Sequence, residues 1–244
     1  MKILVFQHMA TEHPAWLAEI MARRAVGWTV VRLDMDDAIP DLDAYDALLV
    51  MGGAMNVWQE EAHPWLVAEK AAIRRWVREL GRPYFGICLG HQLLAAALGG
   101  EVVPAAHSEA GIVALDLLPV AAEDALFGGL SSPVAAMQWH GAEVARLPEG
   151  ATLLAHNAAC PVQAMRVGTC AWGVQHHPEV TEETLAHWAA QADFAPALIA
   201  HDGPDSLAAF IADTEAAMAT FHRDAEHLFG RFLDLVGEAS EQRA

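Results

Sequence analysis

The segment at residues 83–92 restricts the fold more than any other part of the chain. Its sequence, PYFGICLGHQ, predicts a short buried strand, a sharp turn at Cys88 and then an apolar helix. Gly86 and Gly90 flank the cysteine in the spacing G-x-C-x-G, which is the pattern of a nucleophile elbow with sulfur in place of oxygen. The two glycines relieve crowding where such a turn forces its central residue into a rare backbone conformation.

A thiol at this turn would lie at a helix N-terminus. Unpaired N–H groups and the helix dipole stabilise a thiolate there and lower its pKa. The elbow therefore predicts that Cys88 is a nucleophile. The alternative is a buried structural cysteine beside two packing glycines, because free cysteines are commonly buried.

The charge of the chain excludes two classes of partner. The formal net charge is −18 over 244 residues, and there is no run of lysine and arginine. Nucleic acid and anionic membrane surfaces would be repelled, so neither is an expected partner. Hydrophobic residues make up 54% of the chain, enough for a sizeable core in one large α/β domain or two small ones.

Cysteine usage and the start of the sequence predict a cytoplasmic location. Cys88, Cys160 and Cys170 are an odd number without paired spacing, which favours a reduced chain over a disulfide scaffold. The apolar run at residues 3–6 is too short for the core of a signal peptide or for a membrane span.

The first half of the sequence alternates between strand and helix patterns. Apolar runs of strand length occur at residues 2–7, 28–33, 47–51 and 84–87. Helical periodicity occurs at residues 14–24 and 64–80. This alternation predicts an α/β fold with a doubly wound, mostly parallel sheet and helices on both faces, whose sites lie at the carboxyl ends of the strands.

The second half is rich in short strand patterns. They fall at residues 111–118, 134–139, 151–156, 162–167 and 170–175. Turn residues such as those at 148–150 separate them. We expect them to form an antiparallel portion added to the parallel sheet.

The C-terminal part is predicted to be helical, with one helix at residues 182–191 and a long one from about 205 to 236. Apolar and small side chains of the long helix recur at spacings of four and three: Leu207, Ile211, Thr214, Met218, Phe221, Ala225, Leu228, Phe232 and Leu235. Packing on the chain's own domain is favoured over a coiled-coil dimer, because orderly opposite charges do not flank the seam. We therefore expect a catalytic domain over residues 1–200 and a helical extension over 201–244 packed on it.

A cysteine nucleophile needs a base, and His177 is the best of thirteen histidines. In GVQHHPE at residues 173–179 the residue before proline is pushed toward extended geometry. Residues two apart then project to the same side, which places Glu179 beside His177 and directs His176 the other way. The carboxylate can fix the tautomer of the imidazole. The alternative for residues 173–179 is a turn with exposed polar residues. Most other histidines, His8 among them, are expected in loops or on helix faces.

An oxyanion needs two donors, and the backbone can supply both. In an elbow the N–H of the residue after the nucleophile is one donor, here Leu89. The second is expected from Gly52 and Gly53, which follow the strand at residues 47–51 and allow close approach of the backbone.

Together these motifs resemble the class I (triad-type) glutamine amidotransferases, above all the glutaminase domain of GMP synthase and its free-standing relatives. The resemblance is carried by GICLGHQ around Cys88, by the glycine pair about 35 residues upstream and by GVQ-x-HPE downstream. It covers roughly residues 1–200. It implies the flavodoxin-like architecture of that family and cleavage of the glutamine side-chain amide through a γ-glutamyl thioester, with release of ammonia.

The resemblance also implies roles for single residues. Cys88 is the nucleophile, His177 the base and Glu179 the partner that orients it. The backbone of Gly53 and Leu89 forms the oxyanion hole. The residues implied to contact substrate are Gln92, His140 and Gly141.

Three positions depart from the family pattern. Ala54 stands where proline often follows the glycine pair, and His176 stands where phenylalanine usually precedes the catalytic histidine. Ala142 stands where aspartate often follows His-Gly, a change for which Glu143 is a substitute. These changes leave the exact substrate open.

Three functional classes follow. The first is a glutaminase that donates ammonia to a separate synthase, the second is a hydrolase of another γ-glutamyl compound on the same triad, and the third is a non-catalytic relative. The intact set of Cys88, His177 and Glu179 argues against the third. No metal cluster and no phosphate-binding Gly-Lys-Ser/Thr loop is present in the sequence, so no cofactor is expected. A homodimer stays open.

Overall fold

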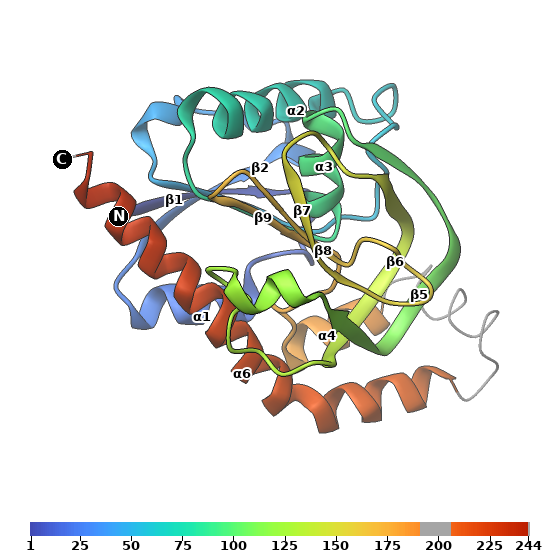
Figure 1. Cartoon of the computed structure of the whole chain (residues 1–244). Helices are drawn as coiled ribbons and strands as arrows, with labels where there is room; N and C mark the ends of the chain where they lie inside the picture. Colours follow the sequence, from blue (N-terminus) through green and yellow to red (C-terminus); the bar gives the residue numbers. More distant parts are fainter. Residues whose placement is uncertain (191–205, 244) are drawn as a thin grey trace.

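The computed structural model describes residues 1–190 and 206–243 of the chain. Its centre is one sheet of nine strands in the order β2-β1-β3-β4-β9-β8-β7-β5-β6 (Figure 1). The strands are β1 (Lys2–Gln7), β2 (Gly27–Arg32), β3 (Ala47–Val50), β4 (Tyr84–Ile87), β5 (Glu101–Leu117), β6 (Val134–Arg146), β7 (Ala151–His156), β8 (Ala164–Val167) and β9 (Ala171–Val174).

The sheet changes from parallel to antiparallel at β9. Strands β2, β1, β3, β4 and β9 run parallel to their neighbours in that order. Strands β8, β7, β5 and β6 continue the sheet in antiparallel pairs. The α/β fold with a parallel sheet and an added antiparallel portion is therefore confirmed.

Strand β9 belongs to the parallel part of the sheet, not to the antiparallel part as expected. The segment around β9 was expected in the antiparallel portion, but β9 pairs parallel with β4, Tyr84 opposite Ala171 and Ile87 opposite Val174. Both strands are fully buried along their length, as parallel strands covered on both faces are. This pairing sets the carboxyl ends of β4 and β9 side by side.

Helices cover both faces of the sheet. They are α1 (Ala15–Arg23), α2 (Trp65–Arg75), α3 (Leu89–Ala97), α4 (Glu182–Ala189) and α6 (Ser206–Glu241). In Figure 1, α2 and α3 lie above the sheet, and α1 and α6 lie below it. Two clusters of buried apolar side chains match these layers, one between the sheet and α1 with α6, the other between the sheet and α2 with α3.

The expected helix at residues 64–80 has an irregular end. Helix α2 stops at Arg75 and a wider turn follows over Trp76–Leu80 before Gly81, whose φ of 58° ends it in the left-handed region. The buried indole of Trp76 donates to the carbonyl oxygen of Pro83 at 3.0 Å, which ties this end to the start of β4.

The long helix α6 buries a broader face than the heptad spacing predicts. Phe210, Phe229 and Leu233 are buried beside the expected Phe221 and Phe232. Phe229 and Phe232 reach the core on the α1 side of the sheet, where both rings pack on Phe85 of β4. The predicted start of this helix at about residue 205 and the expected domain boundary at 200 lie outside the described residues.

A third apolar cluster lies beside the carboxyl end of β9. Val180, Leu185 and Trp188 of the α4 region pack there with Met137 of β6 and Met218 of α6. Within the described residues, no helix combines the length and the apolar character that crossing a lipid bilayer requires.

Candidate active site

Cys88 sits at the turn between β4, near the middle of the sheet, and helix α3. Its φ of 49° and ψ of −104° lie in a strained region, and its N–H donates to the carbonyl oxygen of Val174 in β9 at 2.9 Å. A Cβ added at Gly86 would lie 2.6 Å from the carbonyl group of Gly90, and one at Gly90 would lie 2.2 Å from the carbonyl oxygen of Val50. Both glycines are therefore needed for the chain to make this turn.

His177 and Glu179 follow β9 and form a buried pair. The Nδ1 atom of His177 lies 2.8 Å from a carboxylate oxygen of Glu179, and their side chains are 3% and 1% exposed. The N–H of His177 donates to the carbonyl oxygen of Met137 at 2.9 Å, which fixes the backbone of the turn. A carboxylate only accepts, so Nδ1 carries a proton and Nε2 is left for another partner.

That other partner is the sulfur of Cys88. Burial lowers the pKa of His177, but the charges of Glu179 and Cys88 and the hydrogen bonds to both outweigh it, so the pKa lies well above its usual value. A histidine that stays protonated beside a cysteine stabilises a thiolate. The arrangement of nucleophile, base and orienting carboxylate matches what covalent catalysis requires.

A pocket opens over these groups. It is lined by Met9, Glu12, Gly53, Ala54, Cys88, Trp139, His177 and Trp188. The sulfur of Cys88 also lies 3.8 Å from the carbonyl oxygen of Trp139, and the ring of His177 packs edge-on against Trp188. The reactive side chains thus lie between the indole ring of Trp188, the backbone of Trp139 and the loops after β1 and β3.

The glycine pair lies where the second oxyanion donor was expected. Gly53 lines the same pocket as Cys88, and a Cβ there would lie 2.8 Å from the side chain of Leu89. A Cβ at Gly52 would meet Glu12 and His177. Within residues 1–190 and 206–243 the N–H groups of Gly53 and Leu89 have no hydrogen-bond partner, so both are available to an anion.

Glu12 is a second carboxyl group beside His177, and no motif in the sequence pointed to it. One of its oxygens is buried without a partner in the described part of the chain, and ligand atoms of Glu12, His177 and Glu179 all lie within 4.8 Å of one another. Burial raises the pKa of Glu12 to about 7, while the charge of His177 lowers it and that of Glu179 raises it. This group titrates near neutral pH within the pocket.

Gln92, His140 and Gly141 do not line the pocket. The amide of Gln92 is buried and donates to the carbonyl oxygen of Ala142 at 3.0 Å and to the side chain of Gln175 at 3.1 Å. Gly141 is exposed on β6. The structure brings Cys88, His177, Glu179 and Gly53 together, whereas Gln92 holds the backbone of β6 at Ala142.

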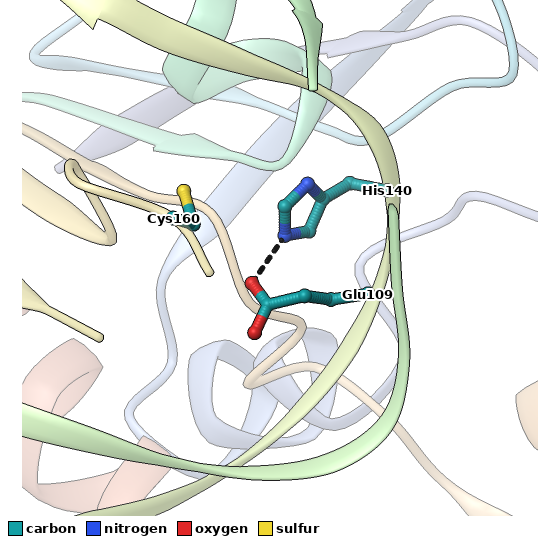
Figure 2. Close-up of side chains that lie close together, drawn as sticks. All are labelled: Glu109, His140 and Cys160. Atoms are coloured by element: carbon teal, nitrogen blue, oxygen red, sulfur yellow. Dashed lines mark hydrogen bonds and ion pairs between the residues drawn. The ribbon is translucent and has the colours of Figure 1, made fainter. Parts of the chain in front are cut away.

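His140 belongs to a buried network centred on Glu109. Figure 2 shows a ring nitrogen of His140 joined to a carboxylate oxygen of Glu109. This nitrogen is Nε2, which lies 3.0 Å from that oxygen, and Nδ1 lies 3.1 Å from the carbonyl oxygen of Ala142. Both partners are oxygen acceptors, so the buried ring of His140 is held between the carboxylate of Glu109 and the backbone of Ala142. Burial raises the pKa of Glu109, but hydrogen bonds from His140, Asn157 and Gln163 outweigh it, and the pKa lies below its usual value.

Cys160 completes this cluster of potential metal ligands. Its sulfur lies within 4.8 Å of the ligand atoms of Glu109 and His140, but it donates to the carbonyl oxygen of Val162. Burial raises the pKa of its thiol to about 12. Because Asn157 and Gln163 also donate to Glu109 at 2.6 and 2.7 Å, these groups satisfy one another as a structural network.

His8 is another residue that was misjudged from the sequence. It lies in the loop after β1, as expected, but it is fully buried there, which the sequence did not indicate. Its position directly after a central strand was the available signal, because sites in such sheets gather at that edge.

Comparison with known proteins identifies the family. The family described as glutamine amidotransferase class-I matches residues 14–193. One of the subunits of the glutamine-hydrolysing GMP synthase of Sulfolobus acidocaldarius is 34% identical over 156 residues, which cover 64% of this chain and 78% of that protein.

Solved structures agree with this match. A glutamine amidotransferase from Methylobacillus flagellatus has a TM-score of 0.84 and 27% identity, covering 96% of this chain and 94% of its own. A glutamine amidotransferase from Thermotoga maritima has the same TM-score at 22% identity, covering 95% and 97%, and supports the fold. The chain therefore belongs to the class I glutamine amidotransferases and is an enzyme of that type.

Proposed function

We propose that this enzyme hydrolyses the side-chain amide of glutamine with Cys88 as nucleophile, His177 as base and acid, and Glu179 as the residue that orients His177. The observation that carries the proposal is the strained turn that presents Cys88 to an imidazole whose far nitrogen is fixed by Glu179. The raised pKa of His177 supports an imidazolium ring beside the sulfur of Cys88.

The reaction begins with attack of the Cys88 sulfur on the side-chain carbonyl carbon of glutamine. The carbonyl oxygen becomes an oxyanion, and the C–N bond breaks as His177 gives its proton to the departing ammonia. This leaves a γ-glutamyl thioester on Cys88. Water then attacks the thioester, His177 takes its proton, and glutamate leaves as the thiol regains its starting state.

The oxyanion hole consists of the N–H groups of Gly53 and Leu89. Two observations support it: neither N–H has a partner within the described part of the chain, and Gly53 faces the same pocket as Cys88. Leu89 is the first residue of α3, so the helix dipole adds to the donor.

Gln92, His140 and Gly141 act on substrate through the segment they hold. Gln92 and His140 both bond to the carbonyl oxygen of Ala142, which fixes the end of the segment that carries Trp139 into the pocket. We assign their role to holding this wall of the pocket at the α-amino and carboxylate end of glutamine.

The ammonia is passed to a separate synthase. Relatives of this chain are named as one of the subunits of a glutamine-hydrolysing GMP synthase, which supports a synthase partner of the same kind. The catalytic unit spans residues 1–200, in line with the family match at 14–193, and residues 201–244 extend it. The three free cysteines support the proposal of a cytoplasmic location.

A second candidate is a hydrolase of another γ-glutamyl compound on the same three residues. The observation that favours it is the wall of Met9, Ala54 and the acidic Glu12, which lies beside Cys88 and can contact a substituent on the amide nitrogen. A cationic or apolar amine would fit such a wall.

Hydrolysis of glutamine and of a series of γ-glutamyl amides, with and without Cys88→Ala, tests both candidates. The proposal expects release of ammonia from glutamine that disappears in Cys88→Ala. A kcat/KM above ~10⁴ M⁻¹s⁻¹ for a substituted amide, with glutamine far poorer, would favour the second candidate instead.

A further inference from the structure

His8 and Glu69 form a fully buried pair behind the glycine loop. His8 follows β1 and Glu69 lies on α2, and both side chains are 0% exposed. The Nε2 atom of His8 lies 2.8 Å from a carboxylate oxygen of Glu69. The ring also stacks on Trp65 with its centroid 5.4 Å away. Removing such a pair from water costs desolvation free energy, so its presence in the core calls for a structural reason.

What it holds is the carbonyl oxygen of Gly52. The Nδ1 atom of His8 lies 2.8 Å from that oxygen. A carbonyl oxygen only accepts, so Nδ1 carries a proton. Because Nε2 faces a carboxylate, the second nitrogen is protonated as well and His8 is an imidazolium. Burial lowers the pKa of His8, but the charge and hydrogen bond of Glu69 and the hydrogen bond to Gly52 outweigh this effect. The pKa of His8 is therefore raised above its usual value.

The carbonyl of Gly52 and the N–H of Gly53 belong to one peptide group. In a trans peptide these two groups point in opposite directions and rotate together. A donor that fixes the oxygen of Gly52 on the β1 side therefore also fixes the direction of the N–H of Gly53. Gly53 lines the pocket that holds Cys88. Two consecutive glycines have little conformational preference of their own, so this peptide needs an outside anchor.

Neighbouring groups limit the remaining freedom. Gly53 is enclosed by Met55, Leu89 and the Cβ of His8, and Gly52 by Glu12 and His177, so neither position has room for a side chain. These contacts fix the Cα positions, whereas the rotation of the peptide plane between them is set by the hydrogen bond from His8.

From this geometry we infer that His8, held by Glu69, is a positioning residue that aims the Gly53 N–H at the oxyanion. The inference rests on the proposed function, in which that N–H is an oxyanion donor. The positive charge behind the carbonyl also polarises the peptide, which makes its N–H a stronger donor when the oxyanion forms. The effect therefore falls on the transition state and leaves the binding of glutamine nearly unchanged.

The test compares three variants of the whole chain after circular dichroism and thermal melting have shown that they fold. His8→Ala removes the donor. The double variant His8→Asn with Glu69→Gln keeps an amide N–H near the position of Nδ1 and leaves no unpaired buried charge. His227→Ala is the matched control, because His227 donates to the carbonyl oxygen of Gly128 at 2.9 Å on the other side of the fold.

Each variant is assayed for glutamine hydrolysis and for alkylation of Cys88 by iodoacetamide, a reaction that forms no oxyanion. His8→Ala should lower kcat at least ~10-fold, with an upper limit of the ~10²–10³ seen when an oxyanion donor is lost outright. Its KM and its rate of alkylation should stay within about threefold of the starting protein. The double variant should regain a large part of kcat, and His227→Ala should match the starting protein.

Three results would overturn the inference. They are an unchanged kcat in His8→Ala, a loss of kcat matched by an equal loss of alkylation, and a double variant as slow as His8→Ala. Failure of the proposed function looks different: the starting protein and Cys88→Ala would then hydrolyse glutamine at the same rate. If the His8→Ala variant does not fold, the double variant His8→Leu with Glu69→Gln takes its place, because it has neither a donor to Gly52 nor an unpaired buried charge. It should then show the loss of kcat expected of His8→Ala, and a kcat equal to that of His8→Asn with Glu69→Gln would overturn the inference.

Discussion

The side chains of His177 and Glu179, two residues apart along the chain, are joined by a hydrogen bond of 2.8 Å between Nδ1 of the imidazole and a carboxylate oxygen. Pro178 restricts the backbone of His177 before it, and the structure turns at Pro178 and Glu179. The hydrogen bond from the His177 N–H to the carbonyl oxygen of Met137 holds this turn against β6. The tautomer of the proposed base is thereby fixed before any substrate arrives, and its second nitrogen faces Cys88.

Iodoacetamide at neutral pH should modify Cys88 well before the other two cysteines. Burial raises the pKa of the Cys160 thiol to about 12 and that of Cys170 above its usual value, so neither forms much thiolate. Peptide mapping of a time course measures the order. Earlier labelling of Cys160 or Cys170 would contradict the assignment of the nucleophile.

The adjacent histidines should differ sharply on mutation. His177→Ala should lower kcat by at least ~10²-fold, the scale of a lost general base. His176→Phe should change kcat little, because His176 is buried, and burial first and then the charges of His177 and His91 lower its pKa to about 3, so it is not charged at neutral pH. Steady-state kinetics of both variants measure this, and the reverse order would show that the wrong histidine has been chosen.

Glu12→Gln should stabilise the protein at alkaline pH but not at acidic pH. Burial raises the folded-state pKa of Glu12 from 4.5 to about 7, so the folded chain holds a proton that the unfolded chain releases. The favourable contribution of this group is complete below about pH 4.5 and is lost as the pH rises through about 7. The loss should reach roughly 1–3 kcal/mol, since one unit of pKa corresponds to about 1.4 kcal/mol and partial exposure weakens the effect.

Urea unfolding of Glu12→Gln and the starting protein at pH 4.5 and pH 8 checks the sign. The two proteins should differ little at pH 4.5, and the variant should be the more stable at pH 8. The same difference at both pH values would mean that Glu12 does not titrate in this range.

Gly90→Ala should disrupt the elbow. The added methyl group would lie 2.2 Å from the carbonyl oxygen of Val50, and backbone cannot move away as a flexible side chain can. We expect a loss of ~2 kcal/mol or more in the free energy of unfolding, within the range of overpacked cores, together with loss of activity. Gly27→Ala is the control, because nothing lies within 4 Å of a Cβ at that position. Equal stability of the two variants, measured by urea unfolding, would contradict the account of the turn.

The fold class was predictable because its signals are local. Four strand-length apolar runs with helical patterns between them appear as β1 to β4 with α1 and α2. The pairing of β9 was not predictable, because a short apolar run does not show whether its neighbour runs parallel or antiparallel. The same limit hid the true length of β5 and β6, in which polar and apolar residues mix.

The catalytic residues could be predicted from the sequence, whereas the residues behind the glycine loop could not. Cys88 and His177 lie in short motifs that combine a nucleophile or a base with glycine or proline at fixed spacing. A short stretch of sequence is therefore enough to predict their roles. His8 and Glu12 lie in the loop after β1 and Glu69 lies on α2, two segments far apart in the sequence that only the folded chain brings to this site. No periodicity or spacing relates them, which is why the groups behind the glycine loop were missed.

The most direct test of the central claim is a search for the γ-glutamyl thioester. The enzyme is mixed with glutamine, quenched in acid within one turnover and analysed by mass spectrometry of the intact protein and its peptides. The account predicts a mass increase of one glutamyl group on the peptide that carries Cys88, and none in Cys88→Ala. Steady consumption of glutamine with no such adduct, or an adduct on a peptide without Cys88, would contradict it.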